Sequence, residues 1–150
     1  MGTISEILAR AQARANEHNL PYEGALLPDE AYEILRSAPG AKLVDVRTRA
    51  EWDWVGRIPG SVLIEWNTYP NGQPNPHFIA ELQRQVDTES LTMFICRSGA
   101  RSHAAAIAAT ESGYRDSYNV LEGFQGDKDE SEHRDSVGGW RKAGLPWTQS

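Results

Sequence analysis

Short apolar runs alternate with helix-type repeats along this chain, and this alternation limits the fold more than any other feature of the sequence. The runs are three to five residues long, and such runs are typical of strands buried on both faces of a parallel sheet. Strands are predicted at 42–46, 62–64, 91–95 and 118–121. Because helical segments separate them, the sequence predicts an α/β fold with helices on both faces of a parallel sheet.

The amino-terminal segment predicts a helix from about Thr3 to His18, since residues 3–6 have the form of a capping box and the apolar positions then share one face. We expect residues 1–24 to be a helical extension packed on a domain that spans 25–150; a helix that binds a partner is the alternative. Further helices are predicted after Pro28, after Asn75-Pro76, between Ser102 and Gly113, and near Val137 to Ala143.

Length and charge exclude several classes of protein. A chain of 150 residues suits one domain with a sizeable core. The net charge of −6 disfavours nucleic acid and anionic membranes as partners. A single cysteine excludes an internal disulfide, and no apolar stretch approaches the roughly 20 residues that span a bilayer. With no signal-peptide pattern at the start, we expect a cytoplasmic protein.

The single cysteine, Cys96, is the strongest candidate for chemistry. It ends the apolar run at 91–95 and opens the heptapeptide Cys-Arg-Ser-Gly-Ala-Arg-Ser, which an alanine-rich helical segment follows. In open α/β sheets, ligands bind beyond the carboxyl ends of the strands, where the next helix directs unpaired N–H groups. The helix start and the guanidiniums of Arg97 and Arg101 all favour the thiolate, whereas an unperturbed thiol is only roughly 3% ionised at pH 7.

Two other interpretations of these residues stay open. A lone cysteine is often a small hydrophobic residue at the end of a strand. His103, seven residues after Cys96, could form a cysteine–histidine dyad or could be a surface or packing histidine. The four histidines are too dispersed for a metal motif, so no metal and no cofactor are expected.

Several segments together resemble the single-domain rhodanese (thiosulfate sulfurtransferase) family. The heptapeptide 96–102 is similar to the active-site loop of that family, which begins with the nucleophilic cysteine. Residues 43–47, 51–52 and 56–61 look like its two upstream signatures, although Arg57 stands where many members have histidine. Residues 121–124 and 139–146 are similar to its carboxyl-terminal pattern. The resemblance implies one rhodanese-like domain with a central parallel sheet of about five strands.

The resemblance implies a double displacement in which Cys96 takes a sulfane sulfur from thiosulfate, or a related anionic donor, as a persulfide. Because the chain has no second cysteine, the acceptor is expected to be cyanide, a small thiol or an acceptor protein. The residues expected to bind substrate are Arg97, Ser98, Gly99, Ala100, Arg101 and Ser102. The charges at the end of the first strand are expected to support the loop through carboxylate–guanidinium contacts, and they are Asp45, Arg47 and Glu51.

Two rival functions remain. Cysteine-dependent phosphatases and arsenate reductases also use a loop cysteine with an arginine, but the loop of those enzymes has the pattern Cys-x5-Arg. Here four residues separate Cys96 from Arg101, and Ser102 occupies the phosphatase arginine position. A non-catalytic rhodanese-like module that binds a partner is the second rival, through the first helix or the charged segment 126–136. That charged segment is expected to be a solvated loop, with a lid as the alternative.

Overall fold

The computed structural model describes residues 2–149, which form five helices and seven strands. The helices are α1 (Thr3–Glu17), α2 (Pro28–Ser37), α3 (Arg49–Trp54), α4 (Phe78–Gln85) and α5 (Ala100–Glu111). The strands are β1 (Gly24–Leu26), β2 (Lys42–Asp45), β3 (Val62–Leu63), β4 (Asn67–Thr68), β5 (Gln73–Pro74), β6 (Thr92–Ile95) and β7 (Ser117–Val120).

Five of the strands form one parallel sheet in the order β1-β7-β6-β2-β3, and β4 and β5 form a separate antiparallel hairpin. The predicted α/β fold and the four predicted strands of the sheet are confirmed. The fifth strand, β1, was not predicted individually. It pairs with β7 at one edge of the sheet, with Gly24 opposite Tyr118.

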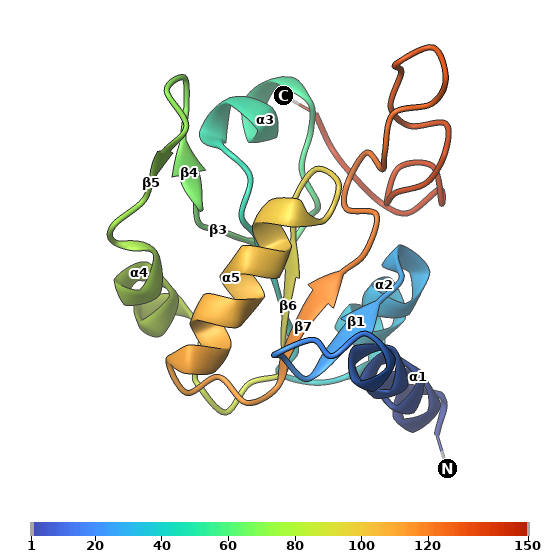
Figure 1. Ribbon diagram of the computed structural model, residues 1–150, viewed down its shortest axis with the longest axis vertical. Coiled ribbons are helices and arrows are strands. Elements are labelled where there is room, and N and C mark those ends of the chain that lie inside the picture. Colours follow the sequence, from blue (N-terminus) through green and yellow to red (C-terminus); the bar gives the residue numbers. More distant parts are fainter. Residues whose placement is uncertain (1, 150) are drawn as a thin grey trace.

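Helices cover both faces of the sheet, as the alternation of strands and helices predicts (Figure 1). Along β6, Met93 and Ile95 face a core that α1 and α2 share with the carboxyl-terminal segment. Phe94 and Cys96, which directly follows the strand, face the opposite core, which α4 and α5 cover. Because side chains alternate along a strand, Cys96 is directed toward α5.

The predicted first helix is confirmed as α1, but its predicted capping box is wrong. The helix starts one residue earlier than that motif requires, with Gly2 as a cap that makes no side-chain hydrogen bond. Packing explains its stability instead, because Ile7 and Ala11 are buried in the core. A Cβ on Gly24 would lie 2.9 Å from the carbonyl carbon of Ala11, so glycine permits the close approach of β1 to α1.

The helix predicted near 137–143 is also wrong, because that segment forms turns. Gly139 has φ of +108°, which an α-helix cannot contain, and a Cβ there would lie 2.6 Å from the amide nitrogen of Gly126. One helix-like bond, from the Ala143 amide to the Gly139 carbonyl, closes a single turn. The segment is held by the fully buried Trp140, whose amide donates to the Gly123 carbonyl at 2.8 Å. Within residues 2–149, no helix is long and apolar enough to cross a membrane.

Candidate active site

Cys96 follows β6 at the carboxyl edge of the sheet, where the strand gives way to the loop that leads into α5. Its side chain is only 1% exposed. The Gly99 amide lies 3.1 Å from Sγ and donates to it, and the Ser102 hydroxyl lies 3.3 Å from Sγ. Within residues 2–149, these are the polar contacts of the sulfur. The site therefore surrounds the sulfur with groups of the same loop.

Gly99 sets the geometry of this loop. It caps α5 with φ of +111°, a left-handed conformation that glycine adopts without strain. This conformation turns the Gly99 N–H toward Sγ and starts a helix of 12 residues directly behind the sulfur. Amide hydrogen bonds and the positive end of a helix both stabilise a negative sulfur. The arrangement therefore suits a thiolate or a persulfide anion.

A second backbone segment supports the start of the loop from behind. The Phe124 amide donates to the Cys96 carbonyl at 2.8 Å, and the Gln125 amide donates to the Arg97 carbonyl at 3.0 Å. Gly123 has φ of +65° and lies so close that a Cβ would be 2.5 Å from the Arg97 carbonyl carbon. We call residues 123–126 the brace. The brace contains part of the carboxyl-terminal pattern that the sequence singled out.

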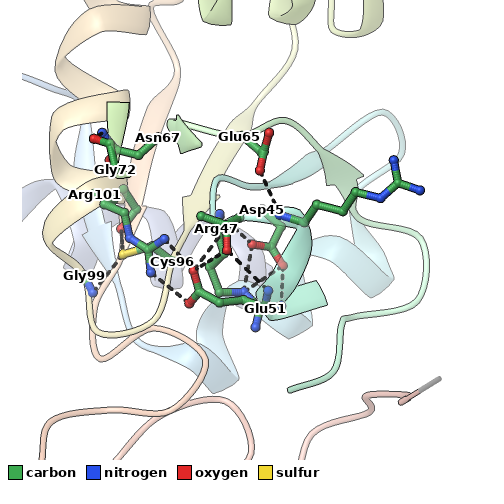
Figure 2. A network of polar contacts seen from close by, with 12 residues as sticks. Asp45, Arg47, Glu51, Glu65, Asn67, Gly72, Cys96, Gly99 and Arg101 are labelled. Carbon is green, nitrogen blue, oxygen red and sulfur yellow. Dashed lines mark hydrogen bonds and ion pairs between the residues drawn. The ribbon is translucent and has the colours of Figure 1, made fainter. Parts of the chain in front are cut away.

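Arg101 lies beside Cys96 with its guanidinium directed toward Glu51 (Figure 2). The pair is bidentate, with N–O distances of 2.7 and 2.9 Å. Burial alone would raise the pKa of Glu51, but the hydrogen bonds and charge of Arg101, the Thr48 amide and the charge of Arg47 together outweigh it, so this pKa is lowered. Burial alone would lower the pKa of Arg101, whereas Glu51 and a Cys96 thiolate raise it, and the net shift is upward. Both side chains are therefore charged at neutral pH.

Glu51 is itself held by the first turn of α3. Its amide donates to the Thr48 hydroxyl at 3.3 Å, and its carboxylate accepts from the Thr48 amide at 3.2 Å, which completes a capping box. The carboxylate that binds Arg101 is thus fixed by the start of a helix rather than by a flexible loop.

Asp45 and Arg47 form a fully buried ion pair at the end of β2, with a shortest N–O distance of 2.7 Å. Arg47 also donates to the Gly56 carbonyl at 2.7 Å, and its guanidinium carbon lies 4.2 Å from the centre of the Phe124 ring. Phe124 belongs to the brace. The buried pair therefore connects the end of β2 to the segment that supports the loop.

Arg97 is the exposed arginine of the loop. Among the described residues its guanidinium has no ion-pair partner, in contrast to Arg101. It lines a cavity of about 530 Å³ together with Glu51, Trp54 and Tyr69. Sequence reasoning did not assign Trp54 or Tyr69 to the site, although Tyr69 opens a turn-rich segment. The signal is visible only in the fold, where both aromatic rings are more than two-thirds exposed beside Arg97.

The remaining loop residues occupy different environments. Ser98 and Gly99 are half-buried and Ala100 is exposed, whereas Ser102 is fully buried. The Ser102 hydroxyl donates to the Asn119 side-chain oxygen at 2.5 Å. Asn119 lies on β7 and was not predicted as a site residue, because nothing in an apolar run marks one polar position as facing the loop.

His103 does not form the dyad with Cys96 that the sequence left open. Its Nδ1 atom instead lies 2.8 Å from the Tyr22 hydroxyl. The charged segment 126–136 is mostly exposed and is organised by Asp129, whose carboxylate accepts from the amides of Ser131 and His133, each at 2.9 Å. Among residues 2–149, no cluster of His, Cys, Asp and Glu side chains could hold a metal ion.

Comparisons with known proteins agree with this geometry. The crystal structure of Rv0390 from M. tuberculosis matches with a TM-score of 0.79 and 44% identity, over 86% of this chain and 99% of that one. An uncharacterised protein of Rickettsia conorii is 35% identical over 79% of this chain and 91% of its own length.

A thiosulfate sulfurtransferase named GlpE, from Pseudomonas syringae pv. syringae, is 31% identical over 66% of this chain and 82% of its own length. A model of the rhodanese-like domain matches residues 27–130, which include every predicted site residue. The chain therefore belongs to the rhodanese-like domain family.

Proposed function

We propose that this protein is a sulfurtransferase that carries sulfane sulfur on Cys96. The thiolate attacks the outer sulfur of thiosulfate or a related donor, the S–S bond of the donor breaks, and sulfite leaves with the bonding electron pair. Cys96 is left as a persulfide. The observation that carries this proposal is the Gly99 N–H, which donates to Sγ at 3.1 Å at the amino terminus of α5.

The second displacement returns the enzyme to its starting state. A thiophile attacks the outer sulfur of the persulfide, the S–S bond breaks, and the Cys96 thiolate is regenerated. Since the sequence has one cysteine, the acceptor is external, and cyanide, a small thiol or a protein cysteine meets the requirement. A free thiol of this kind suits a reducing compartment, and we propose the cytoplasm.

The two loop arginines are proposed to act differently. Arg97 is exposed on the cavity with Trp54 and Tyr69, so it binds the oxyanion end of the donor. Arg101 is held by Glu51 on both terminal nitrogens, so its position is fixed. From this fixed position it is proposed to contribute to donor binding. The amides of Ser98 to Ser102 are proposed to hold the outer sulfur of the persulfide.

A cavity of about 530 Å³ beside Arg97 is much larger than thiosulfate requires. The exposed rings of Trp54 and Tyr69 add apolar surface to its wall. This leaves room for a donor or acceptor that carries an organic group.

Intact mass tests the proposal. The reduced protein is incubated with thiosulfate beside a Cys96→Ala variant, and we expect one added sulfur atom in the parent protein only. Cyanide should remove that atom and release thiocyanate.

An unmodified parent protein would contradict sulfur transfer from thiosulfate. Cys96-dependent release of phosphate from an aryl phosphate would then favour the phosphatase alternative. Inactivity with both substrates would favour a partner-binding module.

A further inference from the structure

A chain of side-chain hydrogen bonds leads away from the sulfur, behind the loop. Cys96 Sγ contacts the Ser102 hydroxyl at 3.3 Å, and Ser102 donates to the Asn119 side-chain oxygen at 2.5 Å. The Asn119 side-chain nitrogen donates to the Tyr22 hydroxyl at 3.4 Å, and that hydroxyl lies 2.8 Å from Nδ1 of His103. We call these five residues the relay. The sulfur-transfer chemistry proposed above assigns no role to its last three members.

The relay joins three parts of the fold that are distant in sequence. Cys96, Ser102 and His103 belong to the loop and α5, Asn119 lies on β7, and Tyr22 lies between α1 and β1. Ser102, Asn119 and Tyr22 are at most 5% exposed, so a partner lost from the relay leaves a largely buried polar group. Burial raises the pKa of Tyr22, and a hydrogen bond from Asn119 opposes this shift only in part. The tyrosine hydroxyl therefore keeps its proton.

The far end of the relay opens to a second cavity of about 430 Å³. His103 and Tyr22 line it, together with Arg14 and His18 of the α1 region. The Arg14 guanidinium is paired with the buried carboxylate of Glu30, so its charge is compensated. His18 and His103 are the two imidazole side chains that line this cavity.

In the structure, each group of the relay can donate its hydrogen bond to the next group, in the direction from Cys96 to His103. Ser102 gives its only hydroxyl hydrogen to Asn119, so toward the sulfur it can only accept, which requires a thiol S–H. Tyr22 accepts from Asn119 and is free to donate to a neutral imidazole at His103. The Asn119 amide nitrogen also lies 3.4 Å from the Gly99 carbonyl oxygen, which favours this orientation at rest.

The same five groups can satisfy each other with every bond reversed. If Nδ1 of His103 carries a hydrogen, in the imidazolium or in the neutral Nδ1–H tautomer, it donates to Tyr22, and Tyr22 then needs a new acceptor. A half-turn of the Asn119 amide supplies its oxygen to Tyr22 and its N–H₂ to Ser102, since the planar amide offers one acceptor and one donor edge. Ser102 is then free to donate its hydrogen to Cys96, which must be a thiolate or persulfide anion.

We propose that the Ser102–Asn119–Tyr22–His103 relay couples a hydrogen on Nδ1 of His103 to a negative sulfur at Cys96. The change breaks the S–H bond and forms an Nδ1–H bond; where the neutral tautomer forms, the Nε2–H bond also breaks and its proton goes to solvent. The thiol proton leaves to solvent or substrate, and solvent supplies the proton at His103, so the total proton count is conserved. His103 and Tyr22 are positioning residues, because they act through Asn119 and Ser102. Coupling to a persulfide rests on the proposed function. Coupling to the thiolate does not, because it can be tested without any sulfur transfer.

The test follows thiolate formation directly. Because the chain has one cysteine, the ultraviolet absorbance of the thiolate is the difference between each protein and the same protein carrying Cys96→Ala. Tyr22→Phe removes the hydroxyl of the outer hydrogen bond and His103→Leu removes its ring nitrogen, both with little change in volume. We expect each to lower the ratio of thiolate to thiol near pH 6.5 about fivefold, the effect of one hydrogen bond. The double variant should lower it no further than either single variant.

Two control variants are matched to these changes. His18→Leu removes the other histidine of the second cavity, and Tyr118→Phe removes a buried tyrosine hydroxyl that contacts Gln12 rather than the relay. Both should follow the parent titration. The coupling is refuted if the relay variants also follow the parent, or if their two effects multiply in the double variant. A thiolate that responds to His103 in a protein that takes no sulfur from thiosulfate would refute the proposed function but leave the relay standing.

Discussion

Replacing Gly123 by alanine should push the loop out of position from behind. An added Cβ would lie 2.5 Å from the Arg97 carbonyl carbon and 2.6 Å from the carbonyl oxygens of Arg97 and Cys96. All three are backbone atoms of the loop, so no side-chain rotation relieves the contact. The loop or the brace must move by about 1 Å to restore ordinary van der Waals distances.

The energetic cost has two parts that a control variant separates. Alanine at φ of +65° is in the left-handed region, which costs roughly 1–2 kcal/mol. The clash adds about 1–3 kcal/mol, as overpacking in a close-packed interior does. Gly40 has φ of +82° and nothing within 4 Å of an added Cβ, so Gly40→Ala carries the backbone cost without the clash. It precedes β2, at the opposite end of the sheet from Cys96.

Urea denaturation should therefore show Gly123→Ala to be less stable than Gly40→Ala by about 1–3 kcal/mol. Under conditions in which both variants are folded, the single-turnover rate of sulfur loading from thiosulfate should fall by roughly 100-fold in Gly123→Ala, because a shift of about 1 Å misplaces the nucleophile. Gly40→Ala should load sulfur at the parent rate. Equal stability and equal loading in the two variants would show that the brace does not position the loop.

Arg97→Ala should raise the KM for thiosulfate by about tenfold and leave the urea midpoint unchanged, because this exposed guanidinium binds substrate rather than protein. The exposed Arg84→Ala on α4 is the control, and an unchanged KM in Arg97→Ala would remove Arg97 from the donor site. Glu51→Gln should cost about 1–3 kcal/mol of stability at neutral pH, measured by urea denaturation across pH. The folded state lowers the pKa of Glu51, so the parent holds this stability above the unfolded pKa of about 4.3 and loses it as the pH falls through the lowered value. The difference in the free energy of unfolding between the parent and Glu51→Gln should become smaller as the pH falls. A difference that does not change with pH would contradict the ion pair between Glu51 and Arg101 as its source.

The interior strands β2 and β6 were predictable because burial on both faces leaves short segments made mostly of apolar residues, at 42–46 and 91–95. β1 was not, because it is three residues long and reads Gly-Ala-Leu, which has no β-branched residue. Its strand conformation comes from pairing with β7, and its place beside α1 comes from the space that Gly24 leaves. Such a strand is specified by tertiary contacts that sequence periodicity does not contain.

The helix predicted near 137–143 failed for a similar reason. Its composition allowed a helix, but Gly138 and Gly139 lie against the brace, where an added Cβ on Gly139 would meet the Gly126 amide at 2.6 Å. The pair of glycines marks a close approach between two backbones rather than flexibility within a helix. Only the position of residues 123–126 in space distinguishes these two uses of glycine.

For the site, the sequence placed Cys96 at a strand end before a helix, and the structure has that arrangement. It did not predict which carboxylate meets Arg101, because Glu51 lies 50 residues away and composition does not encode that pairing. The relay residues Tyr22 and Asn119 were missed for the same reason. Neither residue belongs to a motif in its own segment, and only the fold shows that both lie beside the loop.

Two of the arginines around the loop, Arg47 and Arg101, are in compensated pairs, whereas Arg97 has no ion-pair partner among the described residues. Arg47 is neutralised by Asp45 and Arg101 by Glu51, so neither presents an isolated positive charge to the sulfur. A negative sulfur is then held mainly by the Gly99 N–H and the amino terminus of α5. Removing Arg101 alone would leave the carboxylate of Glu51 beside the sulfur, so such a variant would report new repulsion as well as lost attraction. The paired arginines fix the shape of the loop, and backbone dipoles set its preference for an anion.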